Sequence, residues 1–222
     1  MKKTLIIIVL ISLLLSACSA PFGSTQTIKG SGVMASETRA VSGFDAIELA
    51  GSADVTIHFG EEESLVIEAE DNLLPVIETN VRGSKLVIRF KPLTTVEMTE
   101  PIRVTITMKK LTEASIPGSG NIVISGLSGE KVKLELPGSG NITANGSVDS
   151  VNITLPGSGN ILCGDLQAKT ATVRLNGSGN IEVYASEDLD VNLNGSGNVT
   201  YRGNPPNIDT SAPGSGEVRA AP

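Results

Sequence analysis

A four-residue turn motif recurs at nearly fixed intervals through the second half of this chain. Gly-Ser-Gly-Asn appears five times and is followed by one Gly-Ser-Gly-Glu variant, at spacings of 20, 19, 20, 18 and 19 residues; the copies begin at Gly118, Gly138, Gly157, Gly177, Gly195 and Gly214. A fixed period near 19 indicates one structural unit that is copied and stacked, because a unit of this size cannot bury its apolar face alone. The repeat therefore predicts a solenoid.

Hydrophobic alternation keeps the same phase as these turns. In one repeat Val132, Leu134 and Leu136 alternate with two charged residues, which is typical of a strand with one buried face. Pro-Gly or Asn-Gly then follows, and we expect a type II turn with positive φ at Gly138 and its equivalents. The pattern predicts an all-β fold, a parallel β-helix (β-solenoid) with two or three short strands per coil. An antiparallel meander or sandwich is the alternative, because Asn-Gly also marks hairpins.

The section before the repeats is rich in β signals but less regular. Five segments are predicted as strands, over 46–49, 55–59, 65–69, 85–90 and 102–108. Residues 71–74 predict one helical turn before Pro75, and Gly51–Asp54 looks like a degenerate copy of the later turn. No linker separates the two halves. We therefore expect a single domain over 37–219, with an irregular β section over 37–110 and regular rungs over 111–219.

The N-terminus has the features of an export signal rather than of the fold. Residues 1–17 combine a basic head with an eleven-residue apolar run, which is too short to span a membrane and suits a lipoprotein signal peptide. Leu15-Ser16-Ala17-Cys18 resembles the bacterial lipobox, in which the cysteine is lipidated; an ordinary signal peptide with a chance cysteine is the alternative. Residues 18–36 are interpreted as the lipidated Cys18 and a flexible tether. We expect an exported protein that is lipid-anchored to the bacterial cell membrane or outer membrane.

Composition narrows the possible partners. Removal of residues 1–17 leaves 15 basic against 24 acidic residues, which disfavours nucleic acid as a partner. Cys163 is the only other cysteine, so a chain lipidated at Cys18 has no intramolecular disulfide. Aromatic residues make up 3% of the chain and there is no Trp, which weighs against a deep ligand cleft.

Three features together carry a resemblance to a known family. Residues 41–49, residues 71–78 and the serial Gly-Ser-Gly-Asn turns resemble the head GIN domain family of auto-transporter adhesins, from about residue 37 to 219. The resemblance implies a right-handed β-helix on a secreted or envelope protein. It implies no established activity and offers no catalytic residues for comparison.

The repeated turns supply the main candidate site. We expect their glycines and asparagines to stack into a structural turn ladder, made of Gly118, Gly120, Asn121, Gly138, Gly140, Asn141, Gly157, Gly159, Asn160, Gly177, Gly179, Asn180, Gly195, Gly197 and Asn198. In the structural interpretation the asparagine amides hydrogen-bond one another and the turn backbone. In the functional interpretation they form a polar ladder that contacts a glycan.

The remaining candidates predict no catalytic centre. Cys163 falls at an inward position, His58 alternates with apolar residues and is predicted to point outward, and Glu61–Glu63 read as a solvated turn. No metal site, cofactor or triad is expected. We also expect no outward position to keep two carboxylates adjacent on successive rungs, as a glycosidase would need.

The sequence therefore predicts a non-catalytic β-helix with an adhesive, structural or binding role. Its expected partners are the membrane, through the lipid anchor, and an envelope protein or surface polysaccharide. A carbohydrate-active enzyme of the lyase or glycosidase kind on the same scaffold is one alternative. An accessory or sensor subunit of an envelope complex is another.

Overall fold

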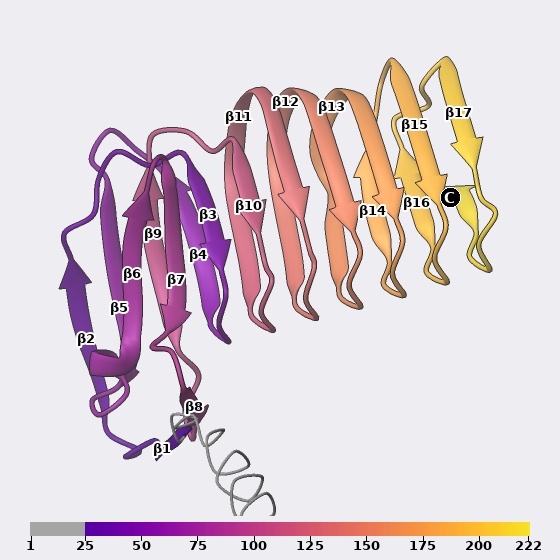
Figure 1. Ribbon diagram of the computed structural model, residues 1–222. Coiled ribbons are helices and arrows are strands. Elements are labelled where there is room, and N and C mark those ends of the chain that lie inside the picture. The colour runs from indigo at the N-terminus through magenta and orange to yellow at the C-terminus, as the bar shows by residue number, and fades with distance from the viewer. Residues whose placement is uncertain (1–24) are drawn as a thin grey trace, which may run out of the picture.

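The computed structural model describes residues 25–222, so the predicted signal peptide and Cys18 lie outside the described residues. The chain winds into a right-handed parallel β-helix whose coils have two walls (Figure 1). Strands of successive coils pair in parallel with equivalent residues side by side, as in Ile142 with Ile161 and Ile153 with Val173. The predicted fold class is confirmed, and the antiparallel alternative does not describe the repeats.

The front wall of Figure 1 and the back wall behind it share three long strands that bend over the upper corner. These are β11 (Asn121–Glu135), β12 (Asn141–Leu155) and β13 (Asn160–Leu175). The front wall also contains β7 (Lys85–Phe90), β3 (Ala46–Leu49), β10 (Glu113–Ser115), β15 (Asp188–Leu193) and β17 (Asn207–Ser211). The back wall also contains β9 (Arg103–Met108), β4 (Asp54–Phe59), β14 (Ile181–Tyr184), β16 (Val199–Arg202) and β18 (Val218–Ala220).

Inward side chains fill the space between the walls in columns. One back-wall column is entirely β-branched and no more than 1% exposed: Val55, Ile122, Ile142, Ile161, Ile181 and Val199. Branched side chains suit this position because they pack well on a pleated surface. The core is therefore a stack of layers, each sealed by the coil above and the coil below.

The first coils do not follow chain order. Strands β3 and β4, from residues 46–59, stack directly against β10 and β11, and β7 and β9 lie on their other side. Residues 46–59 thus form the coil next to the regular repeats, and residues 85–108 form the coil beyond it, toward the N-terminal end of the stack. The chain then returns to the other side of residues 46–59 to continue the β-helix with β10 and β11. The regular stack reaches into the section expected to be irregular. Gly51–Asp54 is confirmed as a copy of the later turn, because Asp54 pairs in register with Asn121.

Antiparallel strands close the N-terminal end of the stack. Strand β6 (Ile77–Arg82) pairs with β7, β5 (Ser64–Glu70) pairs with β9, and β2 (Met34–Arg39) pairs with β5. The helical turn predicted over 71–74 lies slightly later: residues 71–73 form a turn, and a short 3-10 helix follows at Leu74–Val76. The helix includes Pro75, because the missing N–H of a proline would be unpaired anyway near the start of a helix.

A fully buried carboxylate fastens this end of the molecule. Glu70 accepts hydrogen bonds from the backbone N–H of Gly32 at 2.6 Å and of Thr99 at 3.1 Å, and from the Thr99 hydroxyl at 2.5 Å. These bonds lower the pKa of Glu70, the Thr99 hydroxyl contributing most.

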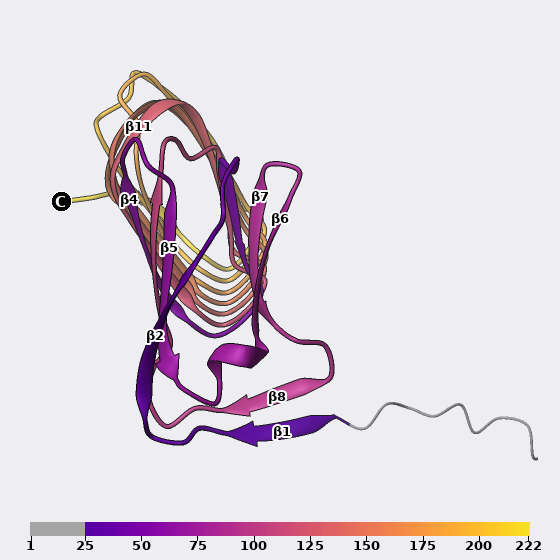
Figure 2. The same ribbon diagram turned by 90° about the vertical axis from the view of Figure 1, so that its left-hand side faces the viewer.

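A two-stranded base lies across the lower end of the molecule. Strand β1 (Gln26–Lys29) pairs in parallel with β8 (Thr94–Glu97), as Figure 2 shows. The range expected to be a flexible tether, 18–36, therefore includes β1 and the first residues of β2, because backbone pairing with distant segments holds them. Within residues 25–222 no helix has the length and apolar character needed to cross a bilayer.

Candidate functional site

The glycines of the repeated turns are required by the close approach of neighbouring coils. Among residues 25–222, the glycines with positive φ all lie outside these turns, so the expected positive φ at Gly138 is wrong. A Cβ placed on Gly138 would lie well under 3.0 Å from the Gly118 carbonyl oxygen, and one on Gly140 would meet the Gly120 oxygen in the same way. The turns are stacked this tightly because their backbones hydrogen-bond from coil to coil, as in the Ser139 N–H to the Gly118 carbonyl at 3.1 Å.

The asparagines beside these glycines form one continuous chain of side-chain hydrogen bonds. The amide N–H of Asn141 donates to the side-chain oxygen of Asn121 at 2.9 Å, and Asn160 donates to Asn141 at 2.9 Å. Asn180 and Asn198 continue the series at 3.1 and 3.3 Å. Every amide donates toward the N-terminal end of the helix.

Both ends of this asparagine ladder have matched partners. At the N-terminal end, the Asn121 amide donates to the carboxylate of Asp54 at 2.8 Å. An ionised carboxylate only accepts hydrogen bonds, so the series can end there without an unpaired donor. At the other end, the Asn198 oxygen accepts the backbone N–H of Glu217 at 3.1 Å. Each asparagine of the ladder thus uses one amide N–H and its side-chain oxygen within the protein, which supports the structural interpretation of the ladder.

An apolar column runs beside the ladder on the outside of the back wall. Val123, Thr143 and Leu162 are side by side in register, and the side chains of Val123 and Leu162 are 40% and 38% exposed. Sequence reasoning missed these residues. The signal was present, because Ile122–Ile124 and Ile161–Cys163 are runs of three apolar residues that interrupt the alternation.

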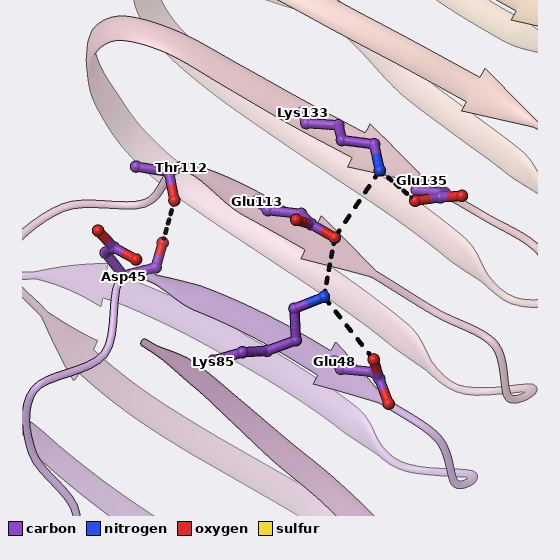
Figure 3. A network of polar contacts seen from close by, with 7 residues as sticks. All are labelled: Asp45, Glu48, Lys85, Thr112, Glu113, Lys133 and Glu135. Atoms are coloured by element: carbon purple, nitrogen blue, oxygen red, sulfur yellow. Dashed lines mark hydrogen bonds and ion pairs between the residues drawn. The ribbon is translucent and has the colours of Figure 1, made fainter. Parts of the chain in front are cut away.

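The front wall carries an ionic network over its N-terminal coils (Figure 3). Lys85 lies between two carboxylates, with its ammonium 3.0 Å from Glu113 and 3.8 Å from Glu48. Lys133 lies 2.6 Å from Glu135 and 3.9 Å from Glu113. The hydrogen bond that the Lys133 ammonium donates to the Glu135 carboxylate raises the pKa of Lys133. These partly exposed pairs join four neighbouring strands, β7, β3, β10 and β11, across the wall.

Towards the C-terminus the same wall becomes acidic, which corrects one expectation. Asp190 and Asp209 are partners in register on β15 and β17, so two carboxylates do lie on adjacent coils. The expectation failed because residues 207–211 were not recognised as a coil; Pro205 and Pro206 interrupt the pattern just before them. Asp188, two residues from Asp190, accepts a hydrogen bond from Asn207 at 2.8 Å. A shallow hollow of about 480 Å³ lies over this region.

The other residues singled out from the sequence are dispersed. Cys163 is fully buried, and desolvation raises the pKa of its thiol to about 12, so it remains a neutral, inert side chain at neutral pH. His58 is exposed on the back wall. Glu63, from the run expected to be solvated, accepts the Gly43 N–H at 2.8 Å. Residues 25–222 contain no group of three or more His, Cys, Asp or Glu side chains arranged to hold a metal ion.

The fold and its two walls define a β-solenoid. The family model described as "Putative auto-transporter adhesin, head GIN domain" matches residues 43–205, and the chain belongs to this family. A search of curated proteins finds no match. The family supports an adhesive or binding role and an exported or surface location.

Solved structures show the same architecture. A putative adhesin from Bacteroides fragilis NCTC 9343 is 22% identical, with a TM-score of 0.71, and the alignment covers 87% of this chain and 100% of that one. A putative lipid binding protein from Parabacteroides distasonis ATCC 8503 is 26% identical, with a TM-score of 0.56 and coverage of 89% and 100%. A putative adhesin from Parabacteroides merdae ATCC 43184 is 19% identical, with a TM-score of 0.55 and coverage of 88% and 99%. The adhesins, at under 25% identity, show the fold alone.

Proposed function

We propose that this protein is a non-catalytic binding module, lipid-anchored through Cys18 to the bacterial envelope, that attaches to an envelope protein or surface polysaccharide through its back wall. The family supports the adhesive part of this proposal. The lipobox-like sequence before Cys18 supports the anchor.

The observation that carries the choice of the back wall is its exposed apolar column. Val123 and Leu162 stay in water while their neighbours in sequence are buried, and Thr143 between them adds a methyl group to the same strip. Exposed apolar strips bordered by polar groups are typical of interaction surfaces. Val123, Thr143 and Leu162 lie on strands that pair directly with one another, so a partner can bind the strip with little ordering of the protein.

The binding role is tested by capture from envelope extracts and by a glycan array. A Val123→Lys/Leu162→Lys variant is compared with Thr154→Lys/Thr172→Lys, which places the same charges on the front wall. Loss of two buried apolar side chains from a contact weakens affinity by about tenfold or more. We expect the back-wall variant alone to lose binding. Equal binding by both variants would contradict the choice of wall.

The anchor is tested separately with Cys18→Ser. We expect the unaltered protein to fractionate with membranes and the variant to be released into the soluble fraction. Membrane association that does not depend on Cys18 would contradict the lipid anchor and leave the binding test unaffected.

A carbohydrate-active enzyme is a second candidate, favoured by the Asp190–Asp209 pair beside the shallow hollow. Paired carboxylates are the machinery of most glycosidases. Cleavage of a polysaccharide that is abolished by both Asp190→Asn and Asp209→Asn would establish this function. Glycan binding without turnover would support the adhesive role, and recovery of one stoichiometric protein would favour an accessory or sensor subunit.

A further inference from the structure

Exposed apolar side chains gather around the two-stranded base at the N-terminal end. Leu93 and Met98 flank β8 and are 59% and 38% exposed, and Val33 and Met34, at the start of β2, are 58% and 40% exposed. Only three other large apolar side chains are exposed to this degree in residues 25–222. The base therefore has an apolar character that the rest of the described surface largely lacks.

The base is held rigidly in place. The N–H of Gln26 donates to the Leu93 carbonyl at 2.8 Å, and the N–H of Gly30 donates to the Glu97 carbonyl at 2.9 Å, so β1 and β8 are fastened at both ends. The buried carboxylate of Glu70 binds the segments that carry Val33 and Met98. The apolar residues at the two ends of the base are consequently fixed relative to each other.

Leu93 is exposed in an unfavourable backbone conformation. Its φ is 59°, in the left-handed region that side chains with a Cβ rarely adopt, and glycine would be the ordinary choice there. A leucine at this position adds local strain and an exposed apolar surface at once. Such strain is typical of functional positions.

The sequence places the base close to the proposed anchor. Thr25 follows Cys18 by seven positions, and a chain of seven residues spans at most about 25 Å. Leu93 is hydrogen-bonded to the residue after Thr25, so it lies near the point where the chain leaves for the anchor. Between the two apolar ends, the exposed side chains of Thr27, Lys29 and Glu97 are polar and can face lipid headgroups.

We propose that the base is a membrane-contacting foot, in which Leu93 and Met98 enter the interfacial region of the bilayer and hold the β-helix in one orientation. The turns with the glycine ladder lie at the same lower edge as the base in Figure 1, so this edge faces the membrane and the upper corners face away. This inference depends on the proposed function, because it requires the lipid anchor at Cys18. A lipid anchor at Cys18 would hold the bilayer within about 25 Å of Thr25, and therefore close to the exposed Leu93, so the bilayer is the partner that we infer for the base.

The absence of Trp from the chain allows a direct test. Leu93→Trp and Met98→Trp are each made in the full-length protein, lipidated in a bacterial host and reconstituted into phosphatidylethanolamine–phosphatidylglycerol vesicles that contain brominated lipid. Leu162→Trp, at the same exposure as Met98 but on the back wall, is the matched control. Circular dichroism checks that each variant is folded.

The expected result is that the Leu93→Trp and Met98→Trp variants lose most of their fluorescence to brominated lipid and shift to the blue, while Leu162→Trp does neither. Flotation with the vesicles combined with unquenched emission at both base positions would overturn the foot and leave the anchor standing. A blue shift without quenching would place the base against protein and would overturn it too. Failure to float would refute the anchor, and the foot with it.

Discussion

A single methyl group at Gly159 should disrupt the stack. A Cβ there would lie well under 3.0 Å from the Gly140 carbonyl oxygen and at 2.8 Å from a methyl of Leu136, so the two coils must move apart. Three hydrogen bonds span that gap: Asn160 N–H to Gly140 at 3.3 Å, Ser158 N–H to Gly138 at 3.0 Å, and the Asn160 amide to Asn141 at 2.9 Å.

The expected loss follows from these contacts. Overpacking costs about 1–3 kcal/mol and the three bonds contribute about 1 kcal/mol each, so Gly159→Ala should lower the free energy of unfolding by about 4–6 kcal/mol. With a urea dependence of about 2 kcal/mol per molar, the midpoint falls by about 2–3 M. Because the chain has no Trp, unfolding is followed by far-ultraviolet circular dichroism on the Cys18→Ser mature chain.

A glycine of the opposite kind provides the control. Gly126 has a φ of 74° and no atom within 4 Å of an added Cβ, so Gly126→Ala should cost only about 1–2 kcal/mol. Asparagine tolerates the left-handed region, and Gly126→Asn should therefore be milder still, whereas Gly159→Asn should be at least as harmful as Gly159→Ala. Equal effects of asparagine at the two positions would refute the argument from close approach.

Three further outcomes are expected. Asn141→Ala removes two ladder bonds and should cost about 1–3 kcal/mol in urea unfolding, against less than about 0.5 kcal/mol for Thr143→Ala in the adjacent column; equal costs would deny the ladder a stabilising role. Cys163, with a thiol pKa raised to about 12, should resist iodoacetamide at pH 8 until the protein unfolds, and rapid alkylation of folded protein would contradict its burial. The pKa of Glu70 is lowered in the folded state, so the stability that this carboxylate contributes is present above the ordinary value of 4.5 and is lost as pH falls through the folded-state pKa. Urea unfolding midpoints measured from pH 6 to pH 3 should therefore decline less steeply in Glu70→Gln than in the unaltered protein. Identical slopes would count against a stabilising role for the Glu70 carboxylate.

The repeats could be predicted because each coil imposes the same local requirement. Alternation such as Val132–Leu136 and the regular glycine pairs specify which residues face inward, and those residues are buried. The reason for the glycines could not be read in the same way. Pro-Gly suggests a turn dihedral, while the operative constraint at Gly138 is a carbonyl oxygen 20 residues earlier in the chain, which no local pattern reveals.

Contacts between distant segments limited the rest. The placement of 85–108 outside 46–59 depends on strand pairing over long separations, and Asp54 meets Asn121 across 67 residues. The Asp190–Asp209 pair was missed because Pro205 and Pro206 interrupt the repeating pattern just before β17. Leu93 was not singled out, because leucine is not a residue expected at positive φ, although it follows Pro92 in a turn closed by the Thr94 N–H and the Lys91 carbonyl at 3.3 Å.

Because every coil meets its neighbours through the same columns, coils are close to interchangeable. Duplication or loss of one 18–20-residue segment would preserve the alignment of glycines, asparagines and core side chains while changing the length of the molecule by one strand spacing, about 4.8 Å. The span of the exposed faces can therefore be altered during evolution in discrete steps, with no redesign of the interior.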